Sequence, residues 1–188
     1  MPSPRALILS GTLMAWLSPS PGADLLASEQ VDASYALRWS GLEVARFDVS
    51  LTANAVDYRI GYAARTTGVV GALFPFTSAG ASEGQMADPG PVPERYAGES
   101  ERRAGRSAWT VIFGSDGEIA EVEVTTPEDE ERDPVPTHLQ KAPDPLALAL
   151  RATQAAGPGA RFQDTSFDGK RAVTFELACE PAEAPASE

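Results

Sequence analysis

The sequence has very few of the residues on which metal sites and acid–base catalysis usually depend. Among 188 residues there is one histidine, His138, and one cysteine, Cys179. A single histidine excludes a metal site built from several histidines, and a single cysteine excludes a disulfide within the chain. The stability of the fold must therefore come from apolar packing, unless Cys179 pairs with another chain.

Positive charge is also scarce. The chain has 15 lysines and arginines against 27 aspartates and glutamates, which gives a formal net charge of −12. A surface of this charge repels phosphate backbones and anionic lipid head groups. We therefore expect no nucleic-acid partner and no peripheral binding to an acidic membrane.

The first part of the chain, Met1 to Ala23, has the composition of a secretory signal peptide. Arg5 is its only charged residue, Ala6 to Leu17 is an apolar core, and the residues that follow are small and proline-rich. Removal of this segment leaves 188 − 23 = 165 residues and takes the net charge to −13, because Arg5 is lost. We therefore expect a periplasmic protein with no transmembrane span after signal removal.

The remaining chain suits one domain with a core of its own. We expect a single β-rich domain over residues 24–179. The last residues, 180–188, contain only Glu, Pro, Ala and Ser with no periodicity. They are expected to form a disordered acidic tail.

Alternation of apolar and polar residues predicts β-strands over most of this domain. Val31 to Trp39 alternates without interruption, and Leu42 to Thr52 changes parity, which indicates a β-bulge near Ala45 and Arg46. Val56 to Tyr62 alternates again, so these three segments are expected to form an antiparallel meander. Tyr96 to Arg103 carries so much charge that it is expected at a solvated edge. Further strands are expected over Ser78–Gly84, Ser107–Phe113, Glu118–Val124, Arg161–Phe167 and Lys170–Leu177.

One helix is predicted, and the chain after it turns back as a β-hairpin. Asp144 and Pro145 are a typical helix start, and Gly157 ends the helix. The Asp168-Gly169 pair between two alternating segments is a strong hairpin signal. One short helix has to bury its apolar face on the sheet, and the buried stripe is expected to contain Leu146, Ala147, Ala149, Leu150 and Thr153.

The segment Thr66 to Phe76 is apolar on consecutive residues and allows two interpretations. It is either a short helical turn that closes one end of the sheet, or an exposed apolar lip around a ligand cavity. Aromatic residues at strand spacing, among them Tyr58, Tyr62 and Trp109, either pack in the core and across strands or line the concave face if the sheet curves. The second interpretation makes Tyr58 and Tyr62 part of the cavity wall. The candidate ligand-binding residues are Val69, Val70, Leu73, Phe74, Phe76, Tyr58 and Tyr62.

Few residues are suited to catalysis. His138 lies in a proline-rich loop, which favours an exposed loop histidine over a catalytic base. Cys179 lies beside Glu180, and a neighbouring carboxylate raises the pKa of a thiol and makes it less reactive. The acidic run from Glu128 to Glu131 lacks the ligand spacing of a calcium loop. We therefore expect no enzyme, no cofactor and no metal.

Several of these segments together resemble an uncharacterised family of exported proteobacterial proteins, the domain of unknown function 3108. The resemblance depends on Asp144-Pro145-Leu146 opening a helix, on the Asp168-Gly169-Lys170-Arg171 turn, and on an N-terminal meander with Tyr35 and a Gly41-Leu42 strand start. It covers roughly Val31 to Leu177. It implies a periplasmic, β-rich protein with a curved antiparallel sheet and no established activity. Members of that family continue with further strands after the cysteine, whereas this chain has only its acidic tail, which would leave an unpaired strand edge after Leu177.

The expected fold is mainly β, a curved, half-barrel-like antiparallel sheet of about eight or nine strands with one α-helix packed on it. The first functional hypothesis is a non-catalytic cell-envelope protein that binds a lipid, another apolar ligand or a segment of an envelope protein in the concave face. The second is an interaction module that takes up a partner strand at a sheet edge. The third is a hydrolase that acts through His138.

Overall fold

The computed structural model describes residues 29–126, 139–157 and 159–179. Three of the sequence expectations lie outside the described residues. These are the signal peptide at 1–23, the loop with His138 and the acidic run, and the acidic tail at 180–188.

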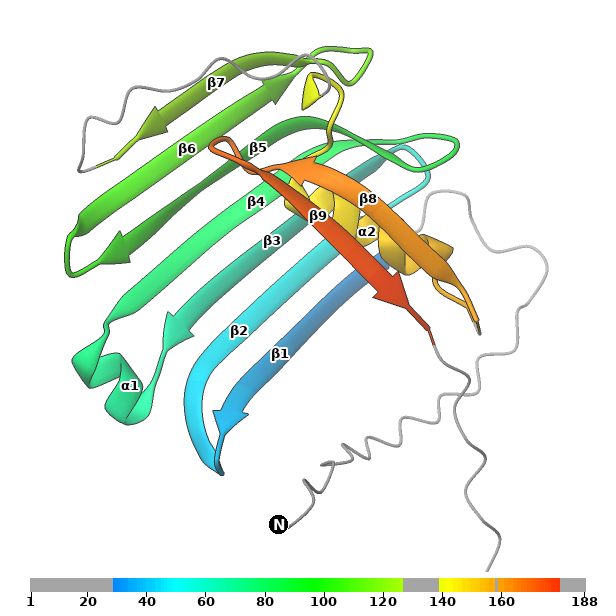
Figure 1. The fold of residues 1–188 in the computed structure, drawn as a ribbon. Helices are drawn as coiled ribbons and strands as arrows, with labels where there is room; N and C mark the ends of the chain where they lie inside the picture. The colour runs from blue at the N-terminus through cyan, green and yellow to red at the C-terminus, as the bar shows by residue number, and fades with distance from the viewer. Residues whose placement is uncertain (1–28, 127–138, 158, 180–188) are drawn as a thin grey trace, which may run out of the picture.

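Seven strands form one antiparallel sheet in which every strand pairs with its neighbours in the sequence (Figure 1). The sheet is therefore a simple meander with β1 and β7 at its two edges. It is twisted and open. Its strands are β1 (Glu29–Trp39), β2 (Leu42–Ala53), β3 (Asp57–Thr66), β4 (Phe76–Met86), β5 (Pro91–Arg102), β6 (Gly105–Phe113) and β7 (Ile119–Thr125).

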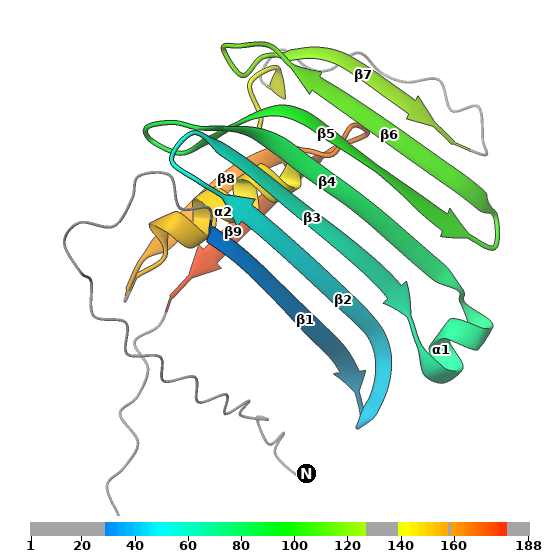
Figure 2. The ribbon, with the colours of Figure 1, turned by 180° about the vertical axis from the view of Figure 1, so that it is seen from behind.

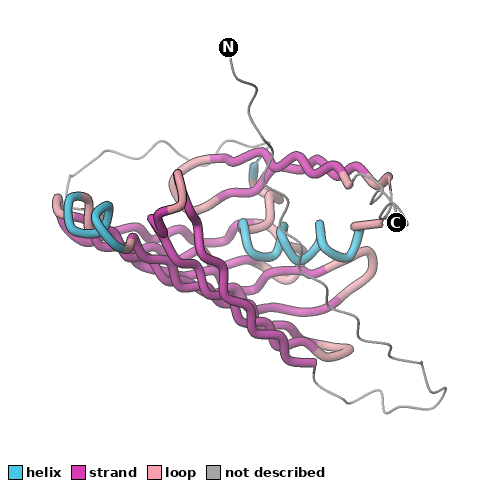
Figure 3. The backbone as a smooth tube through the Cα atoms, turned by 90° about the horizontal axis from the view of Figure 1, so that it is seen from below, coloured by secondary structure: helices cyan, strands magenta, loops and turns pink. Residues whose placement is uncertain are grey.

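A second layer covers part of one face of this sheet. It consists of the helix α2 (Pro145–Ala155) and the two-stranded hairpin of β8 (Arg161–Phe167) and β9 (Ala172–Ala178). Seen from below, α2 lies between the sheet and the hairpin (Figure 3). The helix contacts β3, β4 and β5 on one side and β8 on the other. The expected fold class is confirmed, with nine strands divided between a sheet of seven and a hairpin of two.

The set of buried side chains on α2 differs from the predicted stripe, because the helix lies between two layers. Leu148 and Leu150 are both buried, although residues two apart on a helix point in nearly opposite directions. Leu148 is completely buried and was not predicted, whereas Ala149 and Thr153 are exposed. A helix covered on two sides buries two stripes, and the periodicity of a helix on one sheet predicts only one.

A short helix, α1 (Gly68–Leu73), follows β3 at the end of the sheet far from α2 (Figure 1), which agrees with the first of the two interpretations of this segment. One other feature differs from the sequence expectation. The expected charged edge strand is β5, which lies inside the sheet between β4 and β6. Its charged residues are tolerated there because alternate side chains of β5 point to the solvated face.

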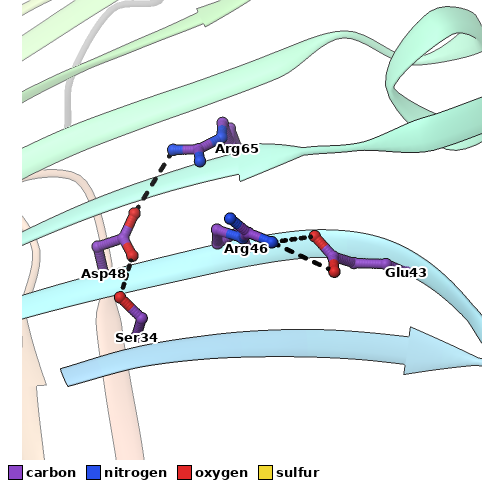
Figure 4. Close-up of polar contacts among 5 residues, drawn as sticks. All are labelled: Ser34, Glu43, Arg46, Asp48 and Arg65. Atoms are coloured by element: carbon purple, nitrogen blue, oxygen red, sulfur yellow. Dashed lines mark hydrogen bonds and ion pairs between the residues drawn. The ribbon is translucent and has the colours of Figure 1, made fainter.

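The two faces of the sheet differ in character. The inner face carries the apolar side chains of each strand and packs on α2 through Tyr58 and Ile60. The outer face, which is in front in Figure 2, is crossed by polar pairs. Asp48 accepts a hydrogen bond from Ser34 at 2.6 Å and forms an ion pair with Arg65 at 3.4 Å (Figure 4). Further ion pairs are Glu43–Arg46, Arg59–Glu83 and Glu99–Arg106. Exposed pairs of this kind each contribute at most about 1 kcal/mol, so they keep the face soluble more than they stabilise it.

Candidate ligand-binding cleft

A cleft of about 400 Å³ lies between the inner face of the sheet and the β8–β9 hairpin. Five of its lining residues are aromatic and six others are polar or charged, among them three cations and one carboxylate. A cavity of this size, in which aromatic side chains lie beside a few polar groups, is typical of a small-molecule site. The lining residues are Tyr62, Phe76, Ser78, Tyr96, Ser100, Arg102, Trp109, Pro145, Asp168, Lys170, Arg171, Val173 and Phe175.

The floor of the cleft is formed by Tyr62 and Trp109, which lie at the two ends of one row of residues across four neighbouring strands. Tyr62 pairs with Gly80, Gly80 with Gly98, and Gly98 with Trp109. A Cβ at Gly98 would lie 2.6 Å from Cζ2 of Trp109, and a Cβ at Gly80 would lie 2.9 Å from Cε1 of Tyr62. The two aromatic rings therefore occupy the space that side chains at the glycines would fill, so they lie directly over the backbone of the sheet.

A hydroxyl chain fixes the tyrosine ring of the floor. Ser78 donates a hydrogen bond to the carbonyl oxygen of Glu99 at 3.1 Å. The hydroxyls of Tyr62 and Ser78 are 2.9 Å apart, and because Ser78 has used its only proton, Tyr62 is the donor. The ring of Tyr62 is thus held in one orientation by the sheet beneath it.

Tyr96 and Trp109 close the inner end of the cleft. Their ring centroids are 6.2 Å apart, and Tyr96 packs in the core with Val111 and Phe113. Burial raises the pKa of the Tyr96 hydroxyl well above its ordinary value, so this group stays protonated and neutral. Nε1 of Trp109 is shielded from solvent and makes no well-formed hydrogen bond, although the Tyr96 hydroxyl lies near enough to interact with it.

The turn of the β8–β9 hairpin brings two cations to the cleft. Oδ1 of Asp168 accepts hydrogen bonds from the backbone N–H groups of Lys170 and Arg171, both at 2.8 Å. Gly169 has a φ of +93°, which a residue with a side chain adopts only with strain. A Cβ on Gly169 would also contact Val111 at 3.4 Å, so the turn lies directly on β6. The positive φ is what needs a glycine here, whereas the contact with Val111 is an ordinary van der Waals contact.

An exposed apolar strip continues from the cleft to the sheet edge. Phe47 stacks on Tyr62 with ring centroids 5.6 Å apart, and Tyr35 pairs with Phe47 in the register of β1 and β2. Tyr35 and Leu37 are 60% and 64% exposed, which is high for large apolar residues on the inner face of a sheet. The apolar strip consists of Val31, Tyr35, Leu37 and Phe47.

A larger hollow, of about 780 Å³, lies across the middle of the sheet. Most of its lining residues alternate onto the outer face, and many are small, such as Gly61, Ala63 and Ala81. It is a shallow depression over backbone, without a group of side chains that converge on one point. The smaller cleft under the hairpin is therefore the better candidate for a ligand.

The structure separates the predicted site residues into three groups. Tyr62 and Phe76 line the cleft. Tyr58 is buried in the core against α2 rather than in the cleft wall. The remaining four lie on or beside α1, where the apolar segment forms the short helical turn that was one of its two interpretations, and none of them lines the cleft. These residues are Val69, Val70, Leu73 and Phe74.

Sequence reasoning did not find the other half of the cleft. Trp109 was expected in the core or on a concave face, and Tyr96 was expected on an edge strand. Arg102, Lys170 and Phe175 received no role, because their strands are distant in the sequence from Tyr62. The one available signal was the pair of glycines, Gly80 and Gly98, at strand positions where a large residue is normal.

A buried polar chain beside the cleft has the residue types of a catalytic group but the surroundings of a structural one. Ser82 donates a hydrogen bond to Oδ2 of Asp144 at 2.8 Å, and the hydroxyl of Tyr58 lies 3.1 Å from Ser82. Oδ1 of Asp144 accepts from the backbone N–H groups of Leu146 and Ala147, so this carboxyl caps α2. Ser82 and Asp144 are fully buried, and the carboxyl that accepts from the serine is the one that caps α2, so the chain joins the helix to the sheet.

The described part of the chain has few other features that could serve a function. Its residues include no group of three or more His, Cys, Asp or Glu side chains that could hold a metal ion. None of the helices described is long and apolar enough to cross a membrane. Cys179 is a free, partly buried thiol after β9.

Comparison with known proteins gives no relative. No family model matches the chain, and no curated protein or solved structure matches it. The resemblance to the domain of unknown function 3108 therefore stays a prediction. The structure itself defines a class, an open antiparallel sheet with a helix and a hairpin on one face and an aromatic cleft between the layers.

Proposed function

We propose that this protein is a non-catalytic binding protein of the periplasm that holds a hydrophobic ligand in the cleft under the β8–β9 hairpin. The observation that carries the proposal is the pair of aromatic rings of Tyr62 and Trp109, which lie against Gly80 and Gly98 and form the floor of a cleft that β9 covers. Apolar ligands gain most of their affinity from the burial of such a surface. The signal-like segment Met1 to Ala23 supports the proposed location.

Two further features support a ligand rather than a packing defect. The side chains of β9 that face the sheet, Val173 and Phe175, line the cleft, and Phe175 is 40% exposed. The apolar strip extends the same surface from Tyr62 toward β1. Exposed apolar surface that continues from a cleft is typical of a binding site.

The test is native mass spectrometry with lipid extraction on the protein purified from the periplasm. The expected result is an apolar molecule that copurifies with one copy of the protein. Ser100→Phe fills the cleft from β5, and Thr77→Phe adds the same ring to the outer face of β4 as a matched control. We expect the ligand to be lost from Ser100→Phe and retained by Thr77→Phe. An empty wild-type protein, or equal occupancy of both variants, would contradict the proposal.

A second candidate is an interaction module that takes up a strand from an envelope protein. The observation that favours it is β1, whose 11 residues pair only with β2 among the described residues. An edge of this length, beside the exposed Tyr35 and Leu37, is suited to strand addition. A photocrosslinker in place of Arg38 on β1 would then give one discrete adduct in cells, and one in place of Thr77 on an interior strand would give none.

A further inference from the structure

We infer that the ligand of the cleft is an amphiphile with an anionic head group, which Arg102 and Lys170 bind while its apolar part lies on the aromatic floor. This inference depends on the proposed function and names its ligand class.

The first step is the distribution of charge. The whole chain has a formal net charge of −12, with 15 basic side chains against 27 acidic ones. The cleft reverses this balance, because it is lined by Arg102, Lys170 and Arg171 and by the single carboxylate of Asp168. A cationic cleft on an acidic protein attracts small anions and gives them a preferred place to bind.

Two of these cations form no ion pair with any residue of the described part of the chain. Nε of Arg171 forms an ion pair with Oδ2 of Asp168 at 3.5 Å. Oδ1 of Asp168 already accepts the two backbone hydrogen bonds of the turn. Neither Arg102 nor Lys170 forms an ion pair with any described residue, whereas exposed arginines of the outer face, such as Arg59, pair with glutamates of neighbouring strands. The cleft therefore has positive charge that its own carboxylate does not neutralise.

The third step is the position of these cations relative to the apolar surface. Arg102 ends β5, two residues beyond Ser100, and Lys170 lies in the hairpin turn opposite, so the cations come from the floor and the roof of one cleft. The rings of Tyr62 and Phe76 line the same cleft. Charged donors beside an aromatic wall fit a molecule that has an anionic oxygen at one end and an apolar chain at the other.

The experiment measures the affinity of the purified mature protein for soluble probes by the fluorescence of its tryptophans, one of which is Trp109 in the cleft. The probes are dodecanoate, dodecyl phosphate and dodecanol, which share one alkyl chain, together with inorganic phosphate, all below their critical micelle concentrations. We expect both anionic amphiphiles to bind about tenfold or more tightly than dodecanol, since one or two charge-assisted hydrogen bonds are worth that factor. Their relative affinities would distinguish a fatty-acid carboxylate from a phosphate head group.

The variant Arg102→Gln/Lys170→Gln removes the unpaired cations, and Arg38→Gln/Arg95→Gln removes the same charge from exposed positions outside the cleft. We expect the first variant to bind the anionic probes no better than dodecanol and the second to keep the preference. Equal binding of dodecanol and dodecanoate by the wild type would overturn the inference and leave the proposed function intact. The inference would also be overturned if Arg102→Gln/Lys170→Gln still bound the anionic probes more tightly than dodecanol. The same holds if inorganic phosphate bound as tightly as the amphiphiles. Failure of every probe to bind would overturn both proposals.

Discussion

Ser82 donates a hydrogen bond to Oδ2 of Asp144 at 2.8 Å, across 62 positions of the sequence. This bond joins the middle of the seven-stranded sheet to the first turn of α2. The same carboxyl accepts two backbone N–H groups of the helix, and the proton of Tyr58 is directed at Ser82. A helix whose start is fixed in this way also fixes where the following hairpin crosses the sheet, and so fixes the roof of the cleft.

Replacement of Asp144 should therefore destabilise the fold strongly. Asp144→Ala removes the helix cap and leaves the buried Ser82 hydroxyl without its acceptor, at a cost of about 3 kcal/mol. Asp144→Asn keeps an acceptor for the helix N–H groups and should cost about 1 kcal/mol. Neither variant offers Ser82 an acceptor at the position of Oδ2, because the amide nitrogen of asparagine is a donor. Urea denaturation of both variants therefore measures the contribution of the helix cap, and equal losses would show that the cap contributes little.

The stability of the protein should also respond to the titration of Asp144. Burial raises the pKa of this carboxyl above its ordinary value of 3.8, and its three hydrogen-bond donors offset only part of this effect. The folded state then holds the proton more tightly than the unfolded state. The free energy of unfolding therefore falls as the pH rises from 3.8 through the raised pKa of the folded state.

The comparison of wild type with Asp144→Asn isolates this effect from the titration of the other carboxyls. We expect the wild type to gain stability relative to Asp144→Asn as the pH is lowered from neutrality toward 4. Urea unfolding at a series of pH values provides the measurement. A difference that does not change with pH would mean that the pKa of Asp144 is the same in the folded and unfolded states.

Because α2 packs between two layers, we expect a large loss of stability from a substitution at Leu148. This side chain would be exposed if the helix packed on the sheet alone. Leu148→Ala should lower the free energy of unfolding by about 3 kcal/mol, because Leu148 is completely buried. Val69→Ala, at a residue of α1 that is 69% exposed, should change it by less than about 0.5 kcal/mol. Thermal and urea unfolding of the two variants test the assignment, which a small loss for Leu148→Ala would contradict.

A side chain at Gly98 should change both the stability of the fold and the position of Trp109 in the cleft. Gly98→Ala places a Cβ 2.6 Å from the backbone oxygen of Ala79 and from the indole of Trp109, so the ring has to move. We expect a loss of about 2 kcal/mol and a changed environment for Trp109 in the fluorescence spectrum. Gly157→Ala, where nothing lies within 4 Å of the added atom, is the matched control and should leave the spectrum unchanged.

Local sequence patterns predicted the elements of this fold well. The alternation in β1, β2 and β3 gave the three-stranded meander, and the bulge expected near Ala45 lies one residue away, since Ala45 and Glu43 pair with consecutive residues of β1. Asp144 and Pro145 begin α2 as predicted, and Asp168-Gly169 forms the hairpin turn. These predictions succeeded because caps, turns and alternation depend on residues that are neighbours in the chain.

The cleft was predicted only in part for the same physical reason. Tyr62 and Phe76 were among the candidate residues, and the cleft includes both. Trp109 and Lys170 were not, because their distance from Tyr62 depends on the register of four strands and on the direction of a hairpin. An apolar segment such as α1 looks like a lip in the sequence, and nothing local shows that it folds at the far end of the sheet.

The sequence by itself determined the secondary structure, the acidic surface and the scarcity of catalytic residue types, since each depends on composition or on neighbouring residues. Only the tertiary structure decided that α2 is covered on both sides and that Gly80 and Gly98 align between Tyr62 and Trp109. It also decided that Arg102 and Lys170 meet at one cleft. Those relations arise from strand register and layer packing, in which a shift of one residue would turn every side chain to the other face.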